Sequence, residues 1–114
     1  MADFNVSSKD DGQISIIDLQ GYLDAHTAPD LENEFNNLIE KQKFKIVVNF
    51  GQLHYISSAG LGVFMSFVET MREQNGDIKF ANLKEDVFSI FDLLGFPQLY
   101  EFYKEENEAI KSFE

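Results

Sequence analysis

The sequence predicts an α/β fold, with about four helices packed on a mixed sheet of about five strands. One reason is that strand-like and helix-like segments alternate along the chain. Another is the almost continuous apolar run at residues 44–50 (FKIVVNF), which follows a helical pattern and is typical of a central strand covered on both faces. The third is size, because 114 residues that are 44% hydrophobic suit one compact core. We therefore expect residues 1–114 to form a single domain.

The first part of the chain predicts a hairpin and then a helix. Residues 4–8 and 14–19 carry strand patterns, with turn-forming residues 9–12 between them. The second strand is expected to stop at Gln20–Gly21, and Thr27 is expected to cap the helix that follows. The inward face of this helix is predicted from helical spacing at Leu31, Phe35, Leu38 and Ile39.

The middle of the chain predicts a second helix. Residues 51–56 are expected to connect the apolar run to a helix at residues 58–74, which ends at Asn75–Gly76. Its inward face is predicted at Leu61, Phe64, Met65, Val68 and Met71. Val63 and Phe67 lie on a different flank, where they pack either on neighbouring elements or on a partner.

The last third predicts a strand, a helix, an edge strand and a terminal helix. A strand at residues 77–81 leads to Asn82, which is expected to cap a third helix that ends before Gly95. The inward positions of that helix are Val87, Phe88, Phe91 and Leu94. Residues 99–103 are expected to form the edge strand and residues 105–113 a short helix.

Charge and composition exclude several classes of function. Asp and Glu total 20 against 9 Lys and Arg, so the net charge is −11, and phosphate backbones and anionic membranes would repel the chain. The absence of Cys excludes disulfides and thiolate metal sites. No apolar run approaches the roughly 20 residues that span a bilayer, and the first residues lack a signal-peptide pattern. We expect a cytoplasmic protein that binds neither nucleic acid nor membrane.

The most informative segment is residues 49–62 (NFGQLHYISSAGLG), where two serines open a helix after a strand. A helix N-terminus presents free N–H groups and a partial positive charge, which suit bound or covalent phosphate. Gly60 and Gly62 each cost about 1 kcal/mol of helix propensity relative to alanine, so they fit a place that another group approaches closely. The alternative is that Ser57 or Ser58 only caps the helix and the glycines allow close packing on the sheet.

Three segments occur in an informative order: residues 21–28 (GYLDAHTA), 55–63 (YISSAGLGV) and 87–96 (VFSIFDLLGF). The second resembles the Asp-Ser-Ser/Thr-Gly-Leu-Gly signature of the STAS domain family, the bacterial anti-sigma factor antagonists. The first is similar to the family's Gly-Glu-Leu-Asp-x-x-Thr-Ala loop, and the third to its apolar helix that ends before a glycine. The resemblance covers nearly the whole chain and implies a single STAS-like domain.

The resemblance also implies a phosphorylated serine and a partner-binding surface. The family's phosphoacceptor lies two positions before the motif glycine, which is Ser58 here. The family's Asp is replaced by Ser57, which makes Ser57 a rival acceptor, and the second Ser/Thr is replaced by Ala59. The implied partner-binding positions are Asp24, Ala25, His26, Ser57, Ser58, Ala59, Gly60, Leu61 and Gly62.

The function implied by the resemblance is partner switching. An unphosphorylated member binds an anti-sigma factor that is also a serine kinase, and so frees the sigma factor. A phosphoserine adds about −1.5 to −2 charges, which makes the docking surface repulsive, and a serine phosphatase of the PP2C type restores binding. We expect a monomer. The other interpretation is a scaffold or adaptor subunit of a signalling complex that is not phosphorylated, in which Ser58 only caps the helix.

Enzymatic and metal-dependent functions are not favoured. A hydrolase nucleophile elbow needs G-x-S-x-G, and neither Ser57 nor Ser58 has a glycine two positions before it. His26 and His54 lack the spacing that fixes two metal ligands on one element. We therefore expect no catalytic residues, no cofactor and no metal.

Overall fold

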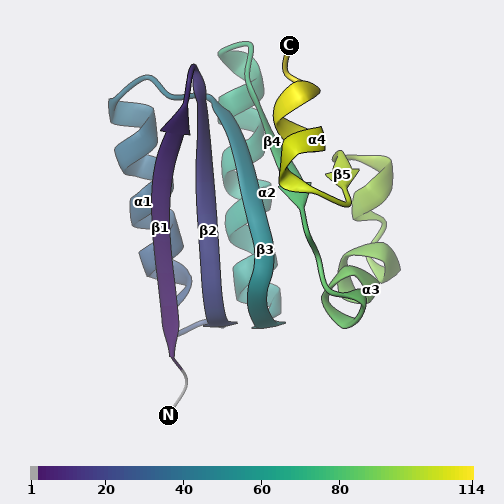
Figure 1. The fold of residues 1–114 in the computed structure, drawn as a ribbon. Coiled ribbons are helices and arrows are strands. Elements are labelled where there is room, and N and C mark those ends of the chain that lie inside the picture. The colour runs from purple at the N-terminus through teal and green to yellow at the C-terminus, as the bar shows by residue number, and fades with distance from the viewer. Residues whose placement is uncertain (1–2) are drawn as a thin grey trace.

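The computed structural model describes residues 3–114, which form five strands and four α-helices and confirm the predicted α/β class (Figure 1). In chain order the elements are β1 (Phe4–Asp11), β2 (Ile14–Leu23), α1 (Ala28–Glu40), β3 (Lys45–Ile56), α2 (Ser58–Glu73), β4 (Asp77–Ala81), α3 (Glu85–Leu93), the short 3₁₀ helix η1 (Phe96–Gln98), β5 (Phe102–Tyr103) and α4 (Glu106–Lys111).

The strands form one mixed sheet in the order β1-β2-β3-β4-β5. β1 and β2 are an antiparallel hairpin, whereas β2, β3, β4 and β5 are parallel to one another. Figure 1 shows α1 and α2 behind this sheet and α4 in front of it. Because β2 and β3 are parallel neighbours, their carboxyl ends lie at the same edge of the sheet, and α1 and α2 both begin there.

The face covered by α1, α2 and α3 holds the main core, which is built around phenylalanines. Phe50 of β3 lies at its centre, with three other ring centroids 5.6 Å away: Phe64 of α2, Phe80 of β4 and Phe91 of α3. All four rings are fully buried. Contacts between aromatic rings add to the free energy of burial. They fix α2 on the sheet, so the residues at the start of α2 stand on a rigid support.

The opposite face is covered by α4 and has a smaller core. Ala109 and Ile110 of α4 are buried against this face of the sheet. Lys79 of β4 is only 5% exposed, and its Nζ donates to the Ser112 hydroxyl at 2.7 Å and lies 4.2 Å from the centroid of the Phe113 ring. A buried ammonium group needs such partners. Lys79 therefore helps to hold α4 on the sheet.

β2 is longer than predicted, because it does not stop at Gln20–Gly21 but runs to Leu23. Gly21 has a φ of +93°, and a Cβ there would lie 2.0 Å from the Asp3 carbonyl oxygen. The same carbonyl accepts the Tyr22 N–H at 2.9 Å. Glycine tolerates this conformation and this close approach, so the residue that was expected to end the strand bends it instead.

β3 is also longer than predicted, because residues 51–56 continue the strand rather than connect it to α2. The register with β2 shifts between Asp18 and Gln20 and again between Gly21 and Tyr22, and each shift places one extra residue in β3. Bulges of this kind break the two-residue alternation of a strand. The buried residues along this part of β3 are therefore spaced by three, at Phe50, Leu53 and Ile56.

α2 begins at Ser58 as predicted, but one of its inward positions was wrong. Met65 is 55% exposed. Val63 is buried, and Phe67 stacks on Phe35 of α1 with 5.0 Å between ring centroids. α2 is therefore turned toward α1, and Val63 and Phe67 pack within the fold.

α3 begins later than predicted. Lys84, and not Asn82, precedes its first turn, and the Asn82 side chain caps no helix. The reason is that the Asn82 N–H still belongs to the sheet, where it donates to the Tyr103 carbonyl at 3.2 Å.

Leu94, which was predicted to be an inward position of this helix, lies after its end and faces solvent. Leu94 is 57% exposed, and α3 stops at Leu93. Gly95 turns the chain with a φ of +79°. Phe96 then fills the buried position beside Phe91, with 5.1 Å between ring centroids.

Three remaining elements have different bounds from those predicted. β1 continues to Asp11, so the hairpin turn is shorter than residues 9–12. β5 spans Phe102–Tyr103 rather than residues 99–103, because the N–H groups of Leu99 and Tyr100 donate to the Phe96 carbonyl of η1 at 2.9 Å. α4 is shorter than residues 105–113: it spans Glu106–Lys111, and Glu105 and Glu108 form a capping box at its start.

Candidate functional site

The carboxyl ends of β2 and β3 bring the two predicted motif loops together. Leu23 and Ile56 are paired in register at these ends. The Ser57 N–H donates to the Leu23 carbonyl at 2.9 Å. Leu23, which precedes the first loop, is thus hydrogen-bonded to Ser57, which precedes α2. Residues 24–26 therefore lie beside the start of α2.

The loop before α1 is closed by its own side chains. The Thr27 hydroxyl accepts the Asp24 N–H at 2.9 Å and donates to the Tyr22 carbonyl at 2.9 Å. The Asp24 carboxylate accepts the N–H groups of His26 at 2.9 Å and Thr27 at 3.1 Å. The prediction that the Thr27 side chain caps α1 was therefore wrong, because its hydroxyl bonds back into the loop.

These hydrogen bonds keep Asp24 ionised. The hydrogen bond from the Thr27 N–H is the main cause that lowers the pKa of the Asp24 carboxyl; desolvation opposes it, and the His26 N–H adds to it. Ala25 and His26 are exposed beside this carboxylate. The loop therefore presents one fixed negative charge at the edge of the site.

The two serines at the start of α2 have different environments. Ser57 is the N-cap residue, half-buried, and its hydroxyl accepts the Gly60 N–H at 3.4 Å. Ser58 is the first helical residue, and it is exposed. Ala59 is half-buried and Leu61 is buried. The hydroxyl of Ser57 is thus engaged with the helix, whereas Ser58 faces solvent.

The start of α2 differs from the other helix starts in charge. The first turns of the other three α-helices carry carboxylates: Asp30 in α1, Glu85 and Asp86 in α3, and Glu106 and Glu108 in α4. The first turn of α2 carries none. A carboxylate in the first turn complements the positive end of the helix dipole. Among the α-helices of residues 3–114, α2 is therefore the one whose positive N-terminal end has no carboxylate in its first turn, so an added anion would be stabilised there.

The two glycines of the motif have different surroundings. A Cβ on Gly60 would lie 2.8 Å from Leu23 Cγ and 3.0 Å from Ile56 Cγ1, whereas a Cβ on Gly62 would meet nothing within 4 Å. Gly60 therefore serves close packing of α2 on the sheet, as the alternative interpretation holds. Gly62 is half-buried, and the space next to its Cα is open.

Sequence reasoning missed the aromatic side chains beside these loops. Tyr22 and Tyr55 are paired in register, 44% and 46% exposed, with 6.4 Å between their ring centroids. The His54 ring lies 6.1 Å from the Tyr22 ring, and its Nδ1 is 3.0 Å from Lys84 Nζ. The available signal was that both tyrosines lie close to the ends of neighbouring parallel strands. It went unrecognised because the strand at residues 44–50 was not expected to reach Tyr55.

Within residues 3–114, no three or more side chains of His, Cys, Asp or Glu are grouped so that they could hold a metal ion. Over the same residues, no helix combines the length and the apolar character needed to cross a bilayer.

Comparison with known proteins agrees with this geometry. The model of the STAS domain family matches residues 5–109. The chain is 31% identical over 105 residues to BtrV of Bordetella bronchiseptica, a candidate anti-sigma factor antagonist, covering 92% of this chain and 90% of that protein. It is 30% identical over 91 residues to the anti-sigma-B factor antagonist of Bacillus subtilis, covering 80% and 83%. The Bacillus cell fate determinant SpoIIAA, solved in its phosphorylated form, superposes with a TM-score of 0.74 at 20% identity, covering 98% of this chain and all of that one.

Proposed function

This chain belongs to the STAS domain family and is an anti-sigma factor antagonist, and we propose that phosphorylation of Ser58 switches off its docking on the anti-sigma factor. The observation that carries the proposal is the exposed Ser58 side chain in the first turn of α2, the α-helix start without a carboxylate. A phosphate there is stabilised by the helix dipole and by the free N–H groups of the first turn.

Ser58 is favoured over Ser57 as the acceptor. A kinase must reach the hydroxyl and place the γ-phosphoryl group of ATP in line with its oxygen. Ser58 is exposed, whereas the half-buried Ser57 hydroxyl accepts the Gly60 N–H. Phosphorylation of Ser57 would disturb the cap of α2, and phosphorylation of Ser58 leaves it in place.

The docking surface of this proposal consists of residues 24–26 together with the start of α2. The hydrogen bond between the Ser57 N–H and the Leu23 carbonyl holds the two parts side by side. Asp24 supplies a carboxylate that suits an arginine or lysine of the partner. Ser58 and Ala59 have small side chains and Gly62 has none, which allows a close approach.

The phosphate acts on docking rather than on the fold. α2 is fixed by the buried rings of the main core, so an added charge at Ser58 leaves the helix in place. At the interface, about −1.5 to −2 added charges must be desolvated next to a partner, on a chain that already carries a net charge of −11. The expected result is loss of affinity with little change of structure.

The switch is part of a cycle in which Ser58 is phosphorylated and dephosphorylated. The anti-sigma factor is itself the serine kinase that modifies Ser58, and a PP2C-type serine phosphatase removes the phosphate. The antagonist is a cytoplasmic monomer without catalytic residues of its own. An exposed phosphoserine suits a phosphatase for the same reason that Ser58 suits the kinase, because both enzymes must reach the oxygen.

The proposal is tested by measuring the affinity of the purified chain for its anti-sigma factor by calorimetry. The Ser58→Asp variant should bind about 100-fold more weakly than the wild type, since like charges at an interface cost several kcal/mol. Without ATP, the Ser58→Ala variant should have the same affinity as the wild type. When ATP is added, the wild type should lose affinity as Ser58 is phosphorylated, whereas Ser58→Ala should keep it.

Mass spectrometry after incubation with the kinase and ATP gives the second readout. The phosphate should map to Ser58, and the Ser57→Ala variant should still be modified. If neither serine gains a phosphate, the chain is a scaffold or adaptor subunit and the switch is excluded.

A further inference from the structure

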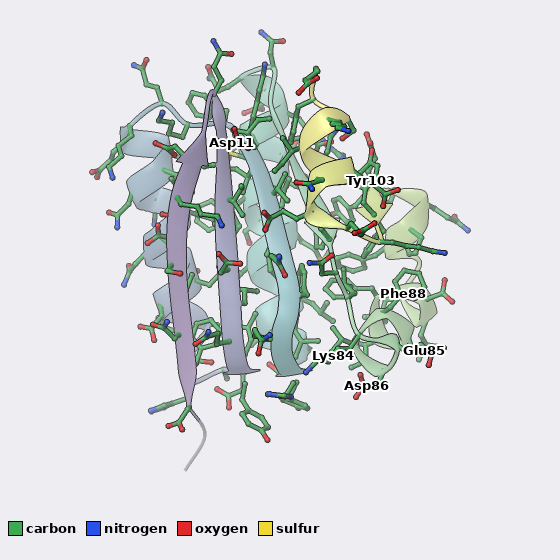
Figure 2. The ribbon with its side chains drawn as sticks, in the orientation of Figure 1. Asp11, Lys84, Glu85, Asp86, Phe88 and Tyr103 are labelled. Carbon is green, nitrogen blue, oxygen red and sulfur yellow. The ribbon has the colours of Figure 1, made fainter. Side chains whose placement is uncertain are left out.

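An open, mostly apolar pocket lies between α3 and β5, away from the motif loops. Its volume is about 320 Å³, and it is lined by Leu83, Glu85, Phe88, Phe102, Tyr103 and Lys104. Figure 2 shows Phe88 and Tyr103 on this side of the molecule, with Lys84, Glu85 and Asp86 below them. A concave site with apolar walls and a few polar groups at its mouth is the usual form of a binding pocket.

The pocket has rigid walls because its aromatic rings are anchored in the core. The Phe102 ring stacks on the buried Phe80 ring with 4.8 Å between centroids. Phe88 meets Phe102 edge to face at 5.5 Å. A preformed cavity does not have to be opened by its ligand, so less free energy is lost on binding.

The fold itself leaves these side chains uncovered. β5 has only two residues, and the chain then turns through Lys104 into α4. α4 packs on the small core that includes Ile16 and Val47, on β2 and β3. Phe102, which packs against the main core, and Phe88, whose ring meets that of Phe102, are therefore only half-buried.

Charge selects the kind of ligand. Glu85 lines the pocket and Asp86 follows it in the first turn of α3, whereas Lys104 also lines the pocket and Lys84 precedes Glu85. These four charges balance, so the attraction for a cation comes from the excess negative charge of the whole chain. The chain as a whole has a net charge of −11. An apolar side chain that enters the pocket with an arginine or lysine next to it gains burial and attraction together.

Position connects the pocket to the site described above. Lys84, which precedes α3, lies 3.0 Å from Nδ1 of His54, and Tyr55, Ile56 and Ser57 follow His54 along the chain. The mouth of the pocket and the start of α2 are thus joined by one stretch of surface. A single partner can contact both.

We propose that this pocket receives an apolar side chain that is flanked by a basic residue, from a segment of the anti-sigma factor, as a second contact that Ser58 does not control directly. The assignment to that partner rests on the proposed function, whereas the preference for an apolar group next to a cation does not.

The first experiment tests the pocket alone. The ¹⁵N-labelled wild-type chain is titrated with N-acetyl-phenylalanyl-arginine amide, and amide shifts are followed by NMR. Saturable shifts are expected at Leu83, Phe88 and residues 102–104, several-fold weaker with N-acetyl-phenylalanyl-glutamate amide. Shifts centred instead on the exposed side chains of Leu93 and Leu94, no saturable shifts, or equal affinity for the two peptides would overturn the proposal.

The second experiment uses the anti-sigma factor and a matched pair of charge reversals. Glu85→Lys at the pocket should weaken binding about tenfold, or about 1.4 kcal/mol. Glu73→Lys makes the same change of charge on an exposed residue at the far end of α2 and should change the affinity less than twofold. Equal effects of the two substitutions would overturn the assignment.

The outcomes separate the two proposals. If Glu85→Lys weakens binding and Ser58→Asp does not, the pocket contact stands and the phosphorylation switch fails. If Ser58→Asp abolishes binding and Glu85→Lys behaves like Glu73→Lys, the switch stands and the pocket contact fails.

Discussion

The starts of α1 and α2 occupy equivalent positions in the fold but differ in how their polar groups are hydrogen-bonded. Each helix follows a parallel strand at the same edge of the sheet. Before α1, Asp24 and Thr27 bond to each other and to the backbone, so the loop satisfies its own polar groups. Before α2, a single 3.4 Å contact from Ser57 closes the helix, and Ser58 is left exposed. In the proposed switch, the loop before α1 provides a fixed surface and the start of α2 carries the hydroxyl that is modified.

The largest effect on stability is expected from Gly60→Ala, which tests how tightly the start of α2 is held. The new Cβ would lie 2.8 Å from Leu23 Cγ, and Leu23 is fully buried. Overpacking of this kind costs about 1–3 kcal/mol. Gly62→Ala is the matched control, because its Cβ meets no neighbour, and it should stabilise the chain by up to about 1 kcal/mol. Urea unfolding of the two variants measures the difference, and equal midpoints would contradict the packing role of Gly60.

The second effect concerns the closed loop before α1. Thr27→Val keeps the shape of the side chain but removes the hydroxyl that bonds to Asp24 and Tyr22. A buried donor or acceptor left without a partner costs about 1–3 kcal/mol, and we expect a loss of about 1–2 kcal/mol in the free energy of unfolding. Thermal unfolding checks the value. If Thr27→Val is as stable as the wild type, the loop is not held by this hydroxyl.

A smaller effect is expected at the start of α2 itself. Ser57→Ala removes the N-cap hydroxyl and should cost about 0.5–1 kcal/mol, at the low end of the usual range because its bond to Gly60 is long. Ser58→Ala removes an exposed hydroxyl and should change stability by less than about 0.5 kcal/mol. Unfolding curves of this pair show whether the two adjacent serines have separate roles. The reverse order of stability would assign the cap to Ser58.

The smallest effect is a pH dependence that comes from Asp24. Its pKa is lowered in the folded chain, so it contributes stability that is present above the ordinary carboxyl pKa and is lost as pH falls through the folded pKa. Asp24→Asn keeps an acceptor oxygen but does not titrate. Between about pH 5 and pH 3, the melting temperature of the wild type should therefore fall further than that of Asp24→Asn. Parallel curves for the two proteins would show that the carboxylate is not stabilised by its loop.

The fold class and the order of the elements could be predicted from the sequence, because helical spacing and the apolar runs of strands are local patterns. The buried faces of α1 and much of α2 followed from this spacing. The length of β3 could not be predicted, because two bulges hide the alternation of its side chains. Met65 and Leu94 were misplaced for a similar reason, since the rotation of α2 and the turn at Gly95 depend on packing with distant residues.

The candidate site could be predicted in part. The serine-containing start of α2 and the loop that carries Asp24 were recognisable as local motifs, and the structure places them side by side. The roles of individual residues were less visible. That Thr27 bonds back into its loop, and that Gly60 is packed while Gly62 is not, depends on contacts with other strands and loops. The pocket lined by Leu83, Phe88 and Phe102 is formed by separate elements and has no signal in any single segment.

The two extra residues in β3 set a rule for how this chain can change in length. β4 accompanies β3 only as far as Asn49, and beyond that point β3 has β2 alone as its neighbour strand. Each extra residue spaces the buried side chains of Phe50, Leu53 and Ile56 by three instead of two. Loss of the extra residue of one bulge leaves the ordinary two-residue alternation, so the later side chains keep their faces of the sheet. Natural variants that keep a folded docking end should therefore lose at most one residue between Phe50 and Leu53 and one between Leu53 and Ile56, a number that can be counted in any related sequence.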